Sequence, residues 1–502
     1  RDCLLSRGLG DVYKRQLMHI SSFPAKYGIG TMGKESFQFV DFLKKSGQKY
    51  WQILPIGPTS FGDSPYQSFS TFAGNPYFID FDLLCEDGSL NLEDYSEIDW
   101  GNEPDRVDYE KIFKNRFKVL KIAYSRDRIR KKAEIDNFRF NHSYWIENYS
   151  LFMALKFDNN LKMYRNWNED IVKRTPEAII NAYNDLNTEI DFWVYVQYLF
   201  YKQWYALKEY ANMQGIKIIG DIPIYVAEDS ADAWSHNEVL MLDSCGIPIK
   251  VAGCPPDGYA PKGQLWGNPL YNWDYLASTG YEWWIERLKA ALKMYDVVRI
   301  DHFRAFDAFY AIDYGKPDAT EGEWLKGPGV DFFNRLKETL GESLALIAED
   351  LGTITDDVRA LLKYSGFPGM KVMQFGFSPG ENSDYLPHNY KNNSVVYIGT
   401  HDNDTLKGWF DSQSEEVQNF AVKYLRLNKD EGYNWGFIKN LLSTVANTAI
   451  VTMQDILNLG NDARMNTPST LGGNWEWRLK SMDLLSDSLS SKLLEITNIY
   501  SR

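Results

Sequence analysis

The sequence predicts an α/β fold, a (β/α)8 TIM barrel with inserted, largely helical subdomains. Short apolar strands alternate with amphipathic helices along most of the chain, which is typical of βα units and a parallel sheet. Several of these strands end in titratable residues, as barrel strands do at the face that carries the active site. The chain has 502 residues, more than one small core serves, and barrels with insertions reach this length as one unit.

The start of the chain differs in character from the rest. Residues 1–16, RDCLLSRGLGDVYKRQ, resemble nothing that follows, and we predict a leader that is not native to the fold. From Leu17 onward, LMHISSFP is typical of a strand and turn, and KESFQFVDFLKKSG has helical spacing closed by Gly47. KYWQILPIGP then reads as a second strand. We expect one catalytic barrel over residues 17–496.

Two segments interrupt the predicted alternation. Residues 84–200 are polar, charged and rich in helix formers, so we expect a mostly helical insertion. Residues 250–272 include AGCPPDGYAPKGQLWGNPLY, which is rich in Gly and Pro and carries aromatic residues. We expect this second segment to be a lid loop over the active site.

The remaining strands follow in order as IKIIGDIPIYVA, VVRIDHFR, LALIAEDLG, MKVMQFGF and SVVYIGTHDNDT. Helical patterns such as GYEWWIERLKAALKMY and VDFFNRLKETLG separate them. An open doubly wound sheet would also place ligands at these strand ends. No GxGxxG motif or P-loop lysine follows a strand, which argues against a nucleotide site.

Composition excludes several classes of protein. The net charge of −14 argues against nucleic-acid binding through a basic surface. None of the four cysteines forms a CxxC pair, so neither a zinc site nor a disulfide framework is indicated. No apolar run approaches the roughly 18 residues of a membrane span, and we see no signal-peptide pattern. We therefore expect a cytoplasmic protein without nucleic-acid or membrane partners.

Three acids end three separate strands and are the candidate catalytic residues. They are Asp301 in RIDHFR, Glu349 in LIAEDLG and Asp402 in GTHDNDT, with spacings of 48 and 53 residues. A closed barrel would bring them to one pocket. Retaining glycoside cleavage needs a nucleophilic carboxylate and an acid/base carboxyl close together, and a third acid can hold the distorted sugar.

The neighbours of these acids suggest how each is tuned. Arg299 lies two residues before Asp301 on the same strand face, and we expect its guanidinium to lower the pKa of Asp301 and to orient it. Glu349 follows the apolar run LALIA, so we expect its pKa to be raised.

Simpler interpretations remain for these acids. A strand-end acid often caps the next helix, and we interpret Asp350, Asp404 and Thr405 in this way.

A metal-dependent barrel hydrolase could use His302, Asp301, His401 and Asp402. It would lack an HxH strand motif, and the chain has only six histidines. A catalytically inactive glucan-binding protein is a third possibility, against which the intact acids argue.

Several motifs together resemble one family. They are ISSFPAKYGIG, KYWQILPIGPT, GDSPYQSFSTFAGNPYFID, GDIPIYVAEDSADAW, AGCPPDGYAPKGQLWGNPLYNWD, VRIDHFRAF, AEDLG, GTHDNDT and RMNTPSTLGGNWEWRL. Over about residues 17–480 the sequence resembles the 4-α-glucanotransferases, or amylomaltases, of glycoside hydrolase family 77 in the α-amylase superfamily. The resemblance implies a (β/α)8 barrel with inserted subdomains, no cofactor, and α-1,4-glucans or maltooligosaccharides as donor and acceptor. An α-glucan hydrolase of the same superfamily is the alternative.

The resemblance also implies roles for individual residues. Asp301 would be the nucleophile, Glu349 the general acid/base and Asp402 the stabiliser of the transition state. The residues implied to bind substrate are Tyr66, Asp221, Asp257, Trp266, Asn268, Arg299 and His401.

Overall fold

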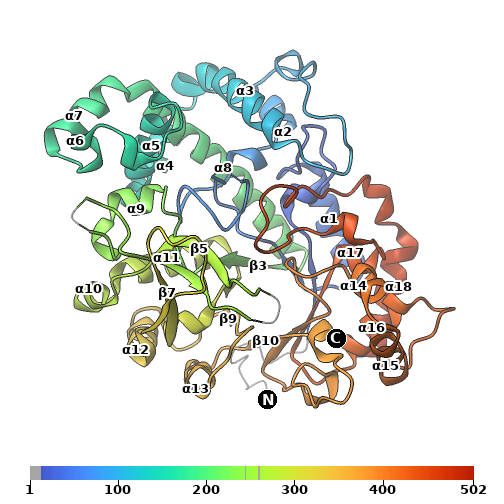
Figure 1. Cartoon of the computed structure of the whole chain (residues 1–502). Coiled ribbons are helices and arrows are strands. Elements are labelled where there is room, and N and C mark those ends of the chain that lie inside the picture. The colour runs from blue at the N-terminus through green and yellow to red at the C-terminus, as the bar shows by residue number, and fades with distance from the viewer. Residues whose placement is uncertain (1–12, 61, 244, 258–259) are drawn as a thin grey trace, which may run out of the picture.

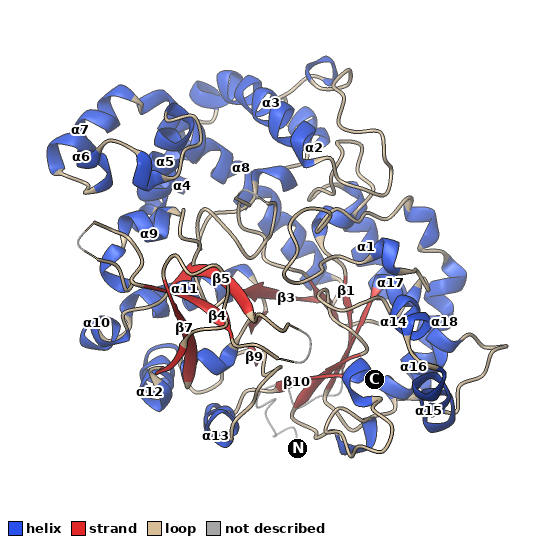
Figure 2. Ribbon diagram, in the orientation of Figure 1, coloured by secondary structure: helices blue, strands red, loops and turns tan. Residues whose placement is uncertain are grey.

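The structure is a computed structural model, which describes residues 13–502 apart from 61, 244 and 258–259. Eight parallel strands form its main sheet (Figures 1 and 2), in the order β10-β11-β12-β1-β2-β3-β6-β9. Their bounds are β1 (Tyr13–Leu17), β2 (Tyr50–Gln52), β3 (Lys217–Ile222), β6 (Val297–Ile300), β9 (Leu346–Ala348), β10 (Gly369–Val372), β11 (Ser394–Tyr397) and β12 (Thr448–Thr452). Helices surround this sheet, so the prediction of a TIM barrel is confirmed.

The two end strands of the sheet, β9 and β10, meet and nearly close the barrel. The amide of Ala348 donates to the carbonyl of Pro368 at 3.0 Å. Oδ1 of Asp350 accepts a hydrogen bond from the amide of Met370 at 2.5 Å. The carboxyl ends of all eight strands therefore face one mouth.

The helices between the strands cover the outside of the barrel (Figure 2). Between β3 and β10 these helices include α11 (Glu282–Met294), α12 (Gly329–Leu340) and α13 (Asp356–Ser365). The last helix of the chain is α18 (Asp487–Ile499). Each buries one apolar stripe, as α12 does with Phe332, Phe333 and Leu336. No helix in the described part of the chain has the length and apolar character to cross a membrane.

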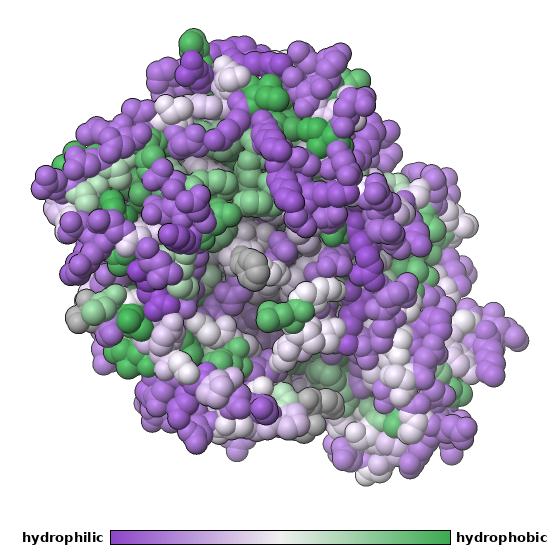
Figure 3. Space-filling view, turned by 45° about the horizontal axis from the view of Figure 1, so that its top comes forward, coloured by the Kyte–Doolittle hydropathy of each residue, from purple (hydrophilic) through white to green (hydrophobic). Residues whose placement is uncertain are grey.

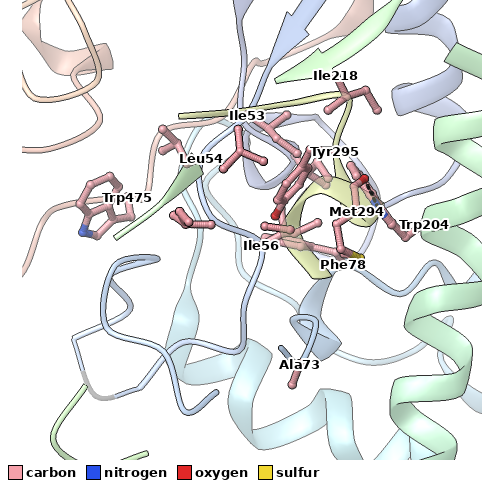
Figure 4. Packing of buried hydrophobic residues seen from close by; sticks show 14 of the residues in the cluster. Ile53, Leu54, Ile56, Ala73, Phe78, Trp204, Ile218, Met294, Tyr295 and Trp475 are labelled. Carbon is pink, nitrogen blue, oxygen red and sulfur yellow. Dashed lines mark hydrogen bonds between the residues drawn. The ribbon is translucent and has the colours of Figure 1, made fainter. Parts of the chain in front are cut away.

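A group of helices between β2 and β3 lies on one side of the barrel, at the top of Figure 1. It contains α3 (Tyr109–Arg130), α4 (Lys132–Asn141), α5 (Ser143–Asp158), α6 (Glu169–Val172), α7 (Pro176–Asp185) and α8 (Asn187–Met213). The long helix α8 runs from this group onto the barrel, where it packs against α1 (Lys34–Lys45) and β3. There, Nε1 of Trp204 donates to the carbonyl of Met294 at 3.1 Å, beside Tyr295 (Figure 4). The predicted insertion boundary at residue 200 thus falls inside one continuous helix.

The prediction of a leader over residues 1–16 is wrong at its end. Tyr13–Leu17 form β1, which pairs with β12 on one side and β2 on the other. Of the segment LMHISSFP, which was predicted to be a strand and turn, only Leu17 belongs to the observed strand, and Ile20–Ser22 form a 3-10 helix. Ladder hydrogen bonds come from the backbone, so a strand can form where the side-chain pattern gives no signal. Residues 1–12 lie outside the described residues.

The segment 250–272 is largely a β-hairpin, so the prediction of a loop is wrong. Strands β4 (Lys250–Cys254) and β5 (Gln264–Pro269) pair in antiparallel fashion, and β4 also pairs with β7 (Ala308–Asp313). With β8 (Glu323–Lys326) they form a four-stranded sheet. The pairing with β7 is distant in sequence, and context of this kind overrides local propensity.

The surface and the core differ in composition. Figure 3 shows a mainly hydrophilic face on which hydrophobic residues occur in small groups. The apolar residues are instead concentrated in a core that joins the barrel to the helical group, part of which appears in Figure 4.

Candidate active site

Neighbouring strands deliver four titratable side chains to the same mouth. Asp221 lies on β3 and is in register with Arg299 on β6. Asp301 directly follows β6, and Glu349 directly follows β9. Since β3, β6 and β9 are adjacent in the sheet, the three acids are neighbours although they are far apart in sequence.

Arg299 holds two of these acids from within the barrel. Its side chain is buried, and its Nη1 donates to both carboxylate oxygens of Asp221, at 2.8 and 2.6 Å. Its Nη2 donates to Oδ1 of Asp301 at 2.7 Å. Charge-assisted bonds of this kind fix the direction of a carboxylate. The predicted contact between Arg299 and Asp301 is thus confirmed.

The predicted lowering of the Asp301 pKa is wrong in its net direction. Burial raises this pKa, and although Arg299 lowers it, the nearby carboxylates of Asp221 and Asp402 raise it further. The guanidinium of Arg299 is shared with Asp221, an acid that sequence spacing does not place beside Asp301. Arg299 therefore moderates the increase instead of reversing it.

The pKa of Glu349 is raised, as the sequence predicts. Burial, followed by the negative charge of Asp301, raises its pKa to about 7. Its Oε2 accepts from the amide of His302 at 2.7 Å, and its Oε1 from the amide of Leu351 at 2.6 Å. His302 is the residue after Asp301 and has a left-handed backbone, with φ of 56°. The carboxyl of Glu349 therefore lies next to the turn that carries Asp301.

The pKa of Asp402 is shifted in the opposite direction. Burial opposes its ionisation, but the charge of His401 and the hydrogen bonds from His401 and Asn466 outweigh burial and lower its pKa to about 2. Nε2 of His401 lies 3.3 Å from Oδ2 of Asp402, and Nδ2 of Asn466 donates to Oδ1 at 2.6 Å. Asp402 is thus an anion while Glu349 keeps its proton.

Tyr66 links the two sides of the mouth. Its hydroxyl donates to Oδ2 of Asp221 at 3.0 Å and lies 2.8 Å from Nε2 of His401. The rings of Tyr66 and His401 are nearly parallel, with centroids 5.4 Å apart. Hydrogen bonds therefore join these two residues to Asp221, and through Arg299 to Asp301.

The sequence analysis assigned no role to a segment that follows β12. Besides the bond from Asn466, Nη2 of Arg464 donates to the backbone carbonyl of Asp402 at 2.6 Å. The ring of Trp475 packs against Tyr66 and His401, with centroids 5.8 and 6.0 Å away. The signal was the motif RMNTPSTLGGNWEWRL, but its spacing alone could not show which side chains turn inward.

Of the three predicted residues on the hairpin, Trp266 contacts the turn after β6. Trp266 on β5 meets the ring of His302 edge to face at 4.7 Å. Asn268 pairs instead with Gln67 at 3.1 Å and with the carbonyl of Val226 at 2.8 Å. Asp257 lies at the hairpin tip, where its Oδ1 accepts from the amide of Ala260 at 2.6 Å.

The interpretation of nearby polar residues as helix caps holds for one of three. Thr405 caps α14 (Leu406–Ser412) by accepting from the amide of Gly408. Asp404 instead pairs with Arg464, and Asp350 binds the backbone of β10 as described above. Within the described ranges, no three His, Cys, Asp or Glu side chains form a group that could hold a metal ion.

The arrangement suits cleavage of a glycosidic bond by two carboxyl groups. Two carboxyls in adjacent turns differ in environment, since Asp301 contacts a guanidinium and Glu349 contacts only amides. Two carboxyl groups whose environments differ in this way can take different roles, one as the reacting carboxylate and the other as the general acid. The third acid, Asp402, is ionised and stands across the mouth.

Comparisons with known proteins show which family the chain resembles. The family model described as 4-alpha-glucanotransferase matches residues 18–484. A 4-alpha-glucanotransferase of Clostridium butyricum is 50% identical over 97% of this chain and 100% of its own length. A chloroplastic/amyloplastic 4-alpha-glucanotransferase of Arabidopsis thaliana is 40% identical over 97% of this chain and 85% of its own. The solved amylomaltase of Streptococcus agalactiae in complex with acarbose is 43% identical, with a TM-score of 0.96, over 98% of this chain and 99% of that chain.

Proposed function

The chain belongs to the 4-alpha-glucanotransferase family, and on that premise we propose that it transfers α-1,4-glucan segments between maltooligosaccharides or starch-like glucans by a retaining double displacement. The observation that carries this proposal is the pairing of Glu349, whose pKa is raised to about 7, with Asp301, which Arg299 fixes in place. One group can give a proton at neutral pH while the other attacks.

In the first step, a carboxylate oxygen of Asp301 attacks C1 of the glucose whose glycosidic bond is to be cleaved. Glu349 gives its proton to the departing O4, and the C1–O4 bond breaks. The shortened chain leaves with a free 4-hydroxyl. The donor segment stays bound to Asp301 as an ester of inverted configuration.

In the second step, the 4-hydroxyl of an acceptor glucan attacks C1. Glu349, now ionised, takes the hydroxyl proton, and the bond from C1 to Asp301 breaks. Two inversions restore the α configuration and return both carboxyls to their starting states.

The surrounding residues would bind and stabilise the reacting sugar. Asp402 stays ionised through both steps and can bind sugar hydroxyls as positive charge develops on the ring. Tyr66, Asp221 and His401 form one hydrogen-bonded group beside it, which supports their assignment to substrate binding. We assign Asp257 and Asn268 to the same function through the family resemblance.

We further propose that the hairpin of β4 and β5 acts as a lid. Transfer prevails over hydrolysis only if an acceptor sugar excludes water from the ester. Trp266 contacts His302, which lies in the turn that carries Asp301 and whose amide binds Glu349. An aromatic face there can pack on a sugar.

Incubation with maltotriose tests the reaction class. We expect glucose and a ladder of longer oligosaccharides, at constant reducing power, because each transfer conserves the number of reducing ends. A steady rise in reducing ends would instead indicate an α-glucan hydrolase. Absence of turnover would indicate a glucan-binding protein without activity.

A further inference from the structure

A small cavity is lined by His401 and by residues that follow the last barrel strand. Its volume is about 10 Å³, and its wall includes His401, Asp404, Gln454 and Asp455. Gln454 and Asp455 belong to α17 (Met453–Ile456), directly after the last barrel strand. A cavity of this size accommodates about one water molecule if polar groups surround it.

One nitrogen of His401 has no hydrogen-bond partner of its own. The residue is only 4% exposed, and its Nε2 faces Tyr66 and Asp402. Its Nδ1 is buried, and no described residue offers it a hydrogen bond. Buried polar atoms are rarely left without a partner because burial removes their water.

Two other residues of the cavity wall carry hydrogen-bond acceptors. The side-chain amide of Gln454 donates through Nε2 to the carbonyl of Ala463 at 3.3 Å, which leaves its Oε1 as an acceptor. The carboxylate of Asp455 accepts from the amide of Leu406 through Oδ1 at 2.7 Å. A molecule that fits would accept one hydrogen bond from Nδ1–H and donate two, as a water molecule can.

We propose that this cavity binds one structural water, which accepts a hydrogen bond from Nδ1–H of His401, donates to Gln454 and Asp455, and thereby keeps His401 doubly protonated beside Asp402. Gln454 is then a positioning residue that acts on Asp402 through the water and the imidazole. It does not touch substrate.

The charges around His401 are consistent with a cation there. Burial opposes its protonation, but the charge and hydrogen bond of Asp402 outweigh burial and raise its pKa, while Arg299 lowers it. His19, two residues after β1, is neutral because burial, aided by the charge of His401, lowers its pKa to about 3. The other titratable groups that face His401 are Tyr66, Asp221 and Asp301 from the mouth, and Asp404, Asp455 and Arg464 from the cavity.

A crystal structure of the protein without substrate tests the site directly. We expect one ordered water within about 3.2 Å of Nδ1 of His401 and within hydrogen-bonding distance of Gln454 or Asp455. A cavity that holds no water, or one more than about 3.5 Å from Nδ1, would overturn the proposal.

Nitrogen NMR of the six histidines tests the consequence, with His401 assigned by comparison with a His401→Gln variant. Gln454→Met removes the acceptor and fills the cavity, so the pKa of His401 should fall by about one, a tenfold change in its protonation equilibrium. Gln454→Glu supplies a stronger acceptor, so His401 should stay doubly protonated to a higher pH. Gln418→Met, the same change on the distant helix α15 (Glu415–Leu425), should leave the His401 signal unchanged.

If Gln454→Met folds and His401 titrates as in the parent protein, the water has no influence and the proposal fails. If that variant does not fold, Gln454→Glu still decides, since an unchanged or lowered pKa of His401 would contradict the proposal. Both experiments are done without a glucan, so their outcome is separate from that of the maltotriose assay.

Discussion

At the scale of single residues, neighbouring carboxyl groups in one site have different proton affinities. Burial acts on all of them, but the partners of each differ. Glu349 accepts only from backbone amides, whereas Asp402 has His401 and Asn466 beside it. Partner identity thus decides which acid keeps its proton at neutral pH.

Replacing the two reacting carboxyls should have separable effects. Asp301→Asn should abolish turnover of every donor. Glu349→Gln should reduce transfer from maltotriose by about 10²–10⁴-fold, the usual contribution of a general acid. The same variant should still form the glycosyl-enzyme from α-maltosyl fluoride, because fluoride leaves without a proton. Stopped-flow fluoride release checks this, and equal loss with both donors would argue against Glu349 as the acid.

The pH dependence of turnover follows from these carboxyls. Glu349 must be protonated for the first step, so the rate should fall as pH rises above about 7. Asp301 must be ionised, and because its pKa is raised, the acidic limb should lie above the ordinary value of an aspartate. Measuring kcat from pH 4 to 9 should give a bell. A flat profile with chemistry rate-limiting would contradict the assignment.

At the scale of elements, two features bear on the site without supplying its acids. One is the hairpin that carries Trp266. The other is the seam between β9 and β10, where Asp350 directly follows Glu349 and binds the amide of Met370. Glycine is required at this seam, since a Cβ at Gly369 would lie 2.6 Å from Oδ2 of Asp350.

Trp266→Ala should lower the ratio of transfer to hydrolysis, because water would reach the ester more readily. Counting new reducing ends against oligosaccharide products from maltotriose measures this ratio. Trp324→Ala is a matched control, since Trp324 lies on β8 of the same sheet and packs on Arg304. If both variants behave alike, or if Trp266→Ala leaves the ratio unchanged, the hairpin is not a lid.

Ionisation of Asp350 should lower the stability of the fold as the pH rises from about 4 to 6. Burial raises its pKa to about 6, so the folded state binds more protons there than the unfolded chain. Stability from this group is complete below the ordinary pKa of an aspartate and is lost as pH rises through about 6. The loss is on the order of 2–3 kcal/mol.

Asp350→Asn keeps an acceptor for the amide of Met370 and removes the titration. We therefore expect it to raise Tm at pH 7 by about 1–3 °C and to have no effect at pH 4, as measured by calorimetry. Asp384→Asn, on the exposed surface nearby, is the control. A lower Tm at pH 7 for Asp350→Asn would show that the carboxylate stabilises the seam.

At the scale of the whole molecule, the sequence predicted the fold best at the buried strands that end in titratable residues. The apolar strands that end in Asp301, Glu349 and Asp402 predicted the barrel, and they also predicted that these three acids share one mouth. A barrel needs this pattern because its strands are buried on both faces and its strand ends line the mouth. The contact between Arg299 and Asp301 followed from strand periodicity alone.

Features that depend on pairing between distant segments were not predictable in this way. β1 begins at Tyr13 because β12 and β2 supply its partners, and β4 forms because β7 lies beside it. The position of Asn466 against Asp402 and the net direction of the Asp301 pKa likewise depend on residues that only the fold brings together. Local pattern carries no information about such neighbours.

The central claim is that Asp301 becomes covalently glycosylated while Glu349 serves as its acid/base. Mass spectrometry of Glu349→Gln, quenched after brief reaction with α-maltosyl fluoride and digested, tests it most directly. We predict a maltosyl adduct of about 324 Da on the peptide that contains Asp301, because the second step lacks its base. An adduct on another residue, or no adduct together with a β-configured first product, would contradict the account.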